Sequence, residues 1–61
     1  MRPNMTIYIS AMHRAITAGD LDRALRIGSA AYRIADIHER RVLSYYLGPN
    51  AARLADLPPG N

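Results

Sequence analysis

The sequence predicts an all-α fold: a helical hairpin extended to a small three-helix bundle, with a short C-terminal helical turn. A Gly-Asp step at residues 19–20 separates two segments, and apolar residues recur at spacings of three, four and seven on both sides of it. Glycine often ends a helix, and aspartate often caps the next one. We expect a single domain over residues 1–61, with flexible ends at 1–4 and 58–61.

The first helix is expected at about residues 5–18, because apolar residues there fall on one helical face. These are Met5, Tyr8, Ile9, Met12, Ala15 and Ile16. Residues 6–9 are rich in β-branched and aromatic side chains, which is also typical of a strand. We favour the helix, since the sequence offers no second strand for pairing. Pro3-Asn4 belongs either to a flexible leader or to the start of this helix.

The second helix is expected to begin at Leu21, with Asp20 as its cap. Its apolar stripe is wider than one neighbour requires and includes small residues that let other helices approach closely. The stripe comprises Leu21, Ala24, Leu25, Gly28, Ala31, Tyr32 and Ala35, broadened by Ile27 and Ile34. This pattern predicts a central helix with neighbours on two sides.

Residues after Ala35 allow two interpretations. Asp36 and Glu39 have the spacing of a capping box, which predicts the start of a third helix. The apolar phase nevertheless continues, which is compatible with one long helix to Leu47. We favour a boundary near Asp36.

The C-terminal part is punctuated by glycine and proline. Gly48-Pro49 is expected to end the preceding helix. Asn50 is then expected to cap a short turn over residues 51–57, which Pro58-Pro59 ends.

Size and composition restrict the function classes. A domain this small leaves much of its surface in water and is marginally stable without a disulfide, a metal or a partner. The chain has no cysteine, which excludes disulfides and the commonest zinc sites and favours self-association or docking on a larger protein or complex. The longest apolar run near the N-terminus, residues 7–9, is too short for a signal peptide or a membrane span. We therefore expect a cytoplasmic protein without a membrane partner.

All eight basic residues are arginine, and the net charge is +3. A GC-rich coding genome explains the arginine bias, and so does interface chemistry, because guanidinium groups bind carboxylates and phosphates in a bidentate manner. The positive charge favours acidic partners and argues against a mimic of DNA.

Two short resemblances accompany the hairpin. Residues 18–25, Ala-Gly-Asp-Leu-Asp-Arg-Ala-Leu, followed by Ala31, resemble the turn and second helix of a tetratricopeptide unit over about 18 residues. That resemblance implies peptide or protein binding on a helical face. The sequence holds no second copy of the unit, so we interpret the likeness as shared hairpin geometry.

The spacing of Ala15 and Gly19 resembles the helix-turn-helix of DNA-binding regulators, in which an alanine lies four residues before the glycine of the turn. The positions that should then be apolar hold Asp20 and Gly28, and Asp22 adds a second carboxylate at the end of the helix that would approach DNA. These departures argue against sequence-specific DNA binding through the hairpin.

The sequence contains no motif that indicates catalysis. His13 and His38 are the only histidines, and neither stands in a motif with a nucleophile, a paired carboxylate or metal-ligand spacing. We therefore expect no enzyme activity, no cofactor and no metal.

The tyrosines indicate binding. Tyr8 and Tyr32 lie on core faces, but adjacent tyrosines on a helix point about 100° apart and cannot both face one core. The predicted protein-binding residues are Tyr45, Tyr46, Arg40, Arg41 and His38. Small proteins of this kind are often regulators, adaptors or inhibitors, including phage-encoded inhibitors of host defence systems, and a homodimer is one mode of association. The alternative is a nucleic-acid-associated regulator that contacts phosphates through Arg14, Arg23, Arg26 and Arg33.

Overall fold

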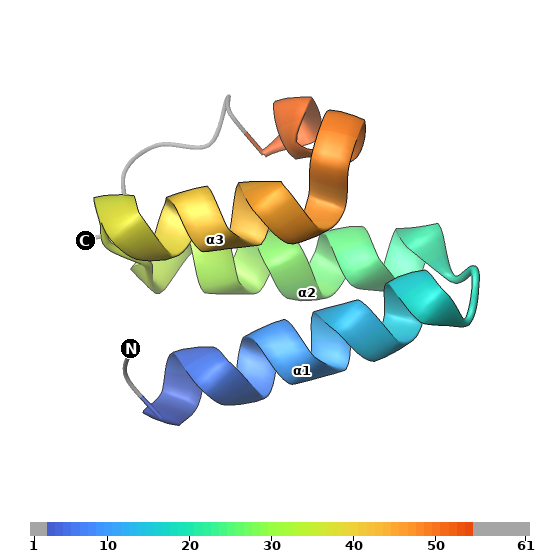
Figure 1. The fold of residues 1–61 in the computed structure, drawn as a ribbon, viewed down its shortest axis with the longest axis horizontal. Coiled ribbons are helices and arrows are strands. Elements are labelled where there is room, and N and C mark those ends of the chain that lie inside the picture. The colour runs from blue at the N-terminus through green and yellow to red at the C-terminus, as the bar shows by residue number, and fades with distance from the viewer. Residues whose placement is uncertain (1–2, 55–61) are drawn as a thin grey trace.

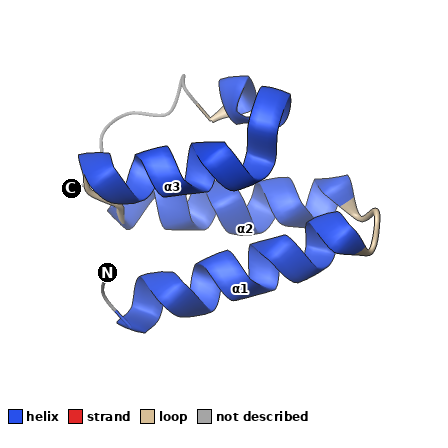
Figure 2. Ribbon diagram, in the orientation of Figure 1, coloured by secondary structure: helices blue, strands red, loops and turns tan. Residues whose placement is uncertain are grey.

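The computed structural model describes residues 3–54, which form three α-helices and a 3₁₀ helix (Figures 1 and 2). The elements are α1 (Pro3–Thr17), α2 (Leu21–Ile34), α3 (Ile37–Leu47) and η1 (Gly48–Arg53). No strand occurs in this part of the chain, and residues 6–9 lie within α1. The all-α prediction is confirmed. Residues 3 and 4, expected within a flexible end, lie in α1, so that part of the prediction was wrong. The other residues of the expected flexible ends lie outside the described range.

Helix α1 begins two residues earlier than expected, at Pro3, where a proline has no amide hydrogen to leave unpaired. It ends in a turn where Gly19 has a φ of 77°, a conformation that glycine adopts without steric cost. The amide of Asp20 donates to the carbonyl of Ala15 at 2.9 Å, and the Asp20 carboxylate accepts from the amide of Arg23 at 3.2 Å. The predicted helix stop and helix cap are both present.

The boundary between α2 and α3 is a complete capping box. The Asp36 carboxylate accepts from the amide of Glu39 at 2.8 Å, and the Glu39 carboxylate accepts from the amide of Asp36 at 2.9 Å. Ala35 and Asp36 are both extended, with ψ of 143° and 179°. Two separate helices therefore form in place of one long helix.

The core lies where α1 and α3 pack against α2, which is the central helix as predicted (Figure 1). A methyl group on Gly28 would lie 3.2 Å from Met12 Sδ, 3.3 Å from Leu47 Cδ1 and 3.4 Å from Leu54 Cδ1. Because Gly28 has no side chain, residues from α1, α3 and the segment after η1 can pack close to the backbone of α2 at this position. The buried apolar residues are Met5, Ile9, Met12, Ala15, Ala24, Ala31, Ala35, Leu43, Leu47 and Leu54.

Two residues of the predicted α2 stripe are exposed. Leu21 is 37% exposed and Ile34 is 47% exposed. They are the first and last residues of α2, where a helix projects past its neighbours. Periodicity along a helix identifies a face but does not reveal how far along that face the neighbouring helices extend.

The prediction for Asn50 was wrong. The turn begins earlier, at Gly48, whose φ of 60° ends α3 and whose amide donates to the carbonyl of Ser44. Asn50 lies inside η1, and its side-chain amide donates back to the carbonyl of Leu47 at 3.5 Å. Gly48 starts the turn directly, so no side chain caps η1. Residues 55–57 of the expected turn and Pro58-Pro59 lie outside the described residues.

Candidate protein-binding surface

Three rings from α1 and α3 meet at the surface. The rings of His13 and Tyr46 have centroids 5.4 Å apart and are tilted by 59°, and the rings of Tyr45 and Tyr46 are 5.7 Å apart in an edge-to-face arrangement. Tyr45 is 82% exposed and Tyr46 is 38% exposed. Both tyrosines thus remain at the surface, where we had expected at least one. We call His13, Tyr45 and Tyr46 the aromatic cluster.

The aromatic cluster continues along α3. His38, Arg41 and Tyr45 are spaced by three and four residues, so they share one helical face, and all three are exposed. We call these residues the outer face of α3. Four of the five predicted protein-binding residues therefore lie in the aromatic cluster or on this face.

The fifth residue, Arg40, is engaged within the molecule. Its guanidinium lies over the ring of Tyr32, 4.2 Å from the centroid, and its Nε donates to the Tyr32 carbonyl at 3.0 Å. This arrangement combines a cation–π contact with a hydrogen bond and joins α3 to the last turns of α2. Arg40 therefore serves the packing of α3 on α2.

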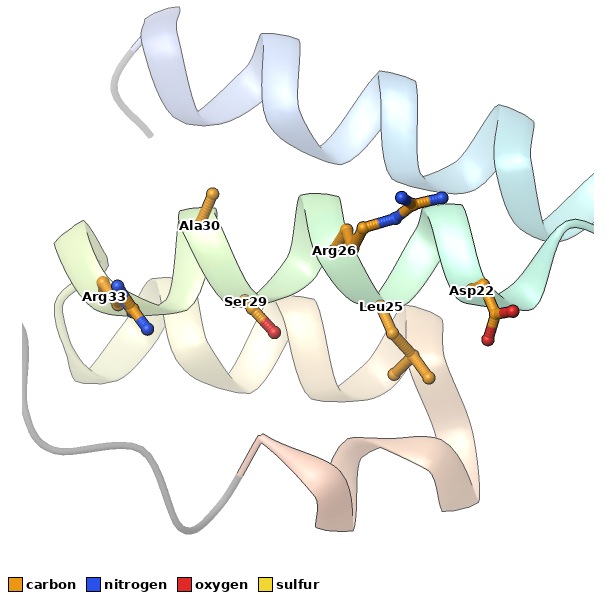
Figure 3. A pocket seen from close by; sticks show the side chains of 6 residues that line it. All are labelled: Asp22, Leu25, Arg26, Ser29, Ala30 and Arg33. Carbon is orange, nitrogen blue, oxygen red and sulfur yellow. The ribbon is translucent and has the colours of Figure 1, made fainter.

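The arginines of the alternative hypothesis lie in two grooves, and each groove includes an aspartate. Arg26 and Arg33 line one groove on α2 together with Asp22. Figure 3 shows the Asp22 carboxylate and the Arg26 guanidinium pointing toward different sides of the helix, although their spacing predicts a pair.

The second groove lies between α1 and α2. Arg14 and Arg23 line it together with Asp20. A phosphate in either groove would approach a carboxylate as well as the guanidinium groups, which weakens its attraction. The four arginines thus line two grooves, and each groove also contains an aspartate.

Helix α1 contributes one residue that sequence reasoning did not assign to a site. His13 lies next to Tyr46, although 33 positions separate them in the chain. Nothing in the local pattern around His13 indicates this contact, because it depends on how α1 lies beside α3. Tyr8 and Tyr32, by contrast, are half-buried against the core as predicted.

Within residues 3–54, no group of three or more His, Cys, Asp or Glu side chains is arranged to hold a metal ion. None of the helices described in this range has both the length and the hydropathy needed to cross a membrane. Comparisons with protein-family models, curated proteins and solved structures gave no significant match to this chain.

Proposed function

We propose that this protein is a non-enzymatic binding module that docks on a larger protein through the aromatic cluster and the outer face of α3. The observation that carries the proposal is the exposure of Tyr45 and Tyr46 beside His13. Tyrosine combines a broad apolar ring with a polar tip, and such rings are enriched at the centres of protein interfaces. Neither ring belongs to the hydrophobic core.

The arrangement of the rings reduces the conformational entropy that docking would cost. Tyr46 contacts both His13 and Tyr45, so its ring already has a restricted position before binding. A ring that is ordered in the free protein loses less side-chain freedom on association. Arg41 and His38 then supply polar contacts beside an aromatic centre, as in the rim of an interface.

Occupying a surface on a larger protein is the action of a regulator, an adaptor or an inhibitor, and we assign the chain to this class. Phage-encoded inhibitors of host defence systems are one group within it. The size of the domain supports this assignment, because a helical module of 61 residues offers one or two faces for binding and little interior for a substrate pocket.

Affinity capture tests the proposal. The wild-type protein, Tyr45→Ala/Tyr46→Ala and Arg26→Ala/Arg33→Ala are immobilised and exposed to a lysate of the native source, and captured proteins are identified by mass spectrometry. We expect the tyrosine variant to lose a protein that the arginine variant retains. Circular dichroism establishes that all three chains are equally helical.

Two results would overturn the docking assignment. If the folded tyrosine variant keeps every captured protein, the aromatic cluster is not the interface. If only the arginine variant loses binding, and the lost material is nucleic acid, the phosphate-binding alternative holds, with an affinity that falls steeply as salt increases. Light scattering on the wild-type and tyrosine variants reveals whether the partner is a second copy.

A further inference from the structure

We propose that a second copy of this chain binds at the groove between the end of α2 and α3, in a two-fold contact that pairs Asp36 of each copy with Arg41 of the other. This inference goes beyond the proposed function, because Tyr45 and Tyr46 are not among the described residues that line this groove. We call it the α2–α3 groove, and its lining includes Tyr32, Ala35, Asp36, Ile37, Arg40 and Arg41.

The α2–α3 groove has an exposed apolar side chain in its wall. Ile37, the first residue of α3, is 66% exposed. A contact that covers it removes apolar surface from water, at about 25 cal/mol per Å². The opposite wall is the ring of Tyr32, which already lies 4.2 Å from the Arg40 guanidinium. Arg40 is therefore engaged within the molecule.

The other two charged residues of the groove, Asp36 and Arg41, have opposite signs. Both are exposed. Helix positions five apart differ by about 140° around the axis, so this spacing does not favour a pair within one copy. Asp36 caps α3 through Oδ1, which accepts the amide of Glu39 at 2.8 Å, and a carboxylate has a second oxygen for a further hydrogen bond. The groove thus offers one acid and one base to a partner.

This combination of charges favours a second copy. A two-fold contact pairs residue i of one copy with residue j of its partner, and residue j with residue i. A groove that exposes both Asp36 and Arg41 beside Ile37 therefore complements itself, and both ion pairs form in the same contact. An acidic protein surface or a nucleic acid would answer Arg41 and would place its own negative charge near Asp36.

The size of the groove limits the affinity. Its lining spans the last turn of α2 and the first two turns of α3, whereas stable interfaces bury about 800 Å² on each partner. We therefore expect a weak dimer, with a Kd between about 10 μM and 1 mM. Because Arg41 also belongs to the outer face of α3, a second copy and a larger protein would compete for it.

Sedimentation velocity on the full chain, from about 10 μM to 2 mM, tests the proposal. The average mass should rise toward that of a dimer as concentration increases. Ile37→Ser should weaken the dimer about tenfold. Ile7→Ser is the matched control, because Ile7 is 67% exposed and lies on α1, away from the α2–α3 groove. It should leave the Kd unchanged.

Charge exchange tests the pairing itself. Arg41→Glu and Asp36→Lys should each weaken self-association at least tenfold, since each brings like charges together twice in a two-fold contact. An equimolar mixture of the two variants should associate again, because each copy then meets opposite charges at both positions.

Circular dichroism establishes that both variants remain helical, since Asp36→Lys also removes a helix cap worth about 1 kcal/mol. If Asp36→Lys does not fold, Asp36→Asn replaces it. Asparagine retains a capping side chain and removes only the charge, so this variant should weaken the dimer severalfold.

Three results would overturn the proposal: a monomer at every concentration, a dimer that both Ile37→Ser and Arg41→Glu retain, or two helical charge variants that do not associate when mixed. None of them affects docking through the aromatic cluster. Conversely, Tyr45→Ala/Tyr46→Ala should dimerise like the wild type. Loss of the dimer in that variant would place the second copy on the aromatic cluster and not in the α2–α3 groove.

Discussion

The interior around Gly28, where α1 and α3 approach α2, and the surface around Tyr46, where α3 meets α1, differ in how much each position is constrained. At Gly28, atoms of Met12, Leu47 and Leu54 lie within 3.4 Å of the place a methyl group would occupy. At Tyr46, the contact with His13 leaves 38% of the tyrosine exposed.

This difference separates two roles for apolar groups in a very small protein. The packing at Gly28 determines how closely the helices approach, so changes there should affect folding. The rings at the surface can change with little effect on the core, so their identity is available for binding. The proposed function depends on this separation, and each of the following substitutions tests it.

Gly28→Val should have the largest effect. Its branched side chain would overlap the groups from α1, α3 and Leu54. Overpacking of this kind costs about 1–3 kcal/mol, and the gain in helix propensity from replacing glycine, about 0.3 kcal/mol, offsets little of it. We expect the free energy of unfolding to fall by about 3 kcal/mol, which is a large part of the stability of such a small domain. Urea denaturation followed by circular dichroism measures it.

The control for this change is Ala30→Val, at an exposed position of the same helix. It introduces the same β-branched side chain without neighbours to displace, and should cost less than about 1 kcal/mol. Equal stability of the two variants would mean that the close packing at Gly28 does not restrict the core.

Asp36→Ala should have an intermediate effect, because it removes the side-chain cap of the helix that bears both Leu47 and Tyr46. Loss of such a cap costs about 1 kcal/mol, and here the reciprocal bond from Glu39 depends on the same local geometry. Hydrogen exchange should accelerate at the first turn of α3 before it changes elsewhere.

Asp20→Ala is the matched change at the other junction. The bond that it removes is longer, 3.2 Å against 2.8 Å, and has no reciprocal partner. It should therefore cost less than Asp36→Ala. The reverse order would indicate that the turn at Gly19, and not the capping box, limits the stability of the bundle.

The positions that sequence analysis predicted correctly depend on neighbours within four residues. Asp20 and Asp36 cap helices through amides three positions ahead, and Gly19 ends a helix through its own backbone. Asn50 is a local prediction that was wrong, because Gly48 begins the turn before it. The other failures concern residues that are far apart in the chain or the ends of a helix. Nothing local reveals that Ile34 projects beyond the core or that His13 meets Tyr46.

Arg40 illustrates the same limit within the candidate site. Its spacing from Asp36 predicts a pair along α3, and its charge beside Tyr45 and Tyr46 made it a candidate for a partner. The folded chain instead offers it the ring and carbonyl of Tyr32, eight residues earlier on α2. That opportunity exists only because the chain reverses direction at Ala35 and Asp36.

Tyr45→Ala should have the smallest effect on stability and therefore tests the comparison most directly. Tyr45 is 82% exposed, and among the described aromatic rings its ring contacts only that of Tyr46. Substitutions at such positions change the free energy of unfolding by about 0.5 kcal/mol or less. Tyr32→Ala is the matched control, since it removes the same side chain from a half-buried position beneath Arg40 and should cost more than about 1 kcal/mol. If Tyr45→Ala destabilised the fold as much as Tyr32→Ala does, the exposed ring would be part of the structural framework, and its exposure would no longer favour a role in binding.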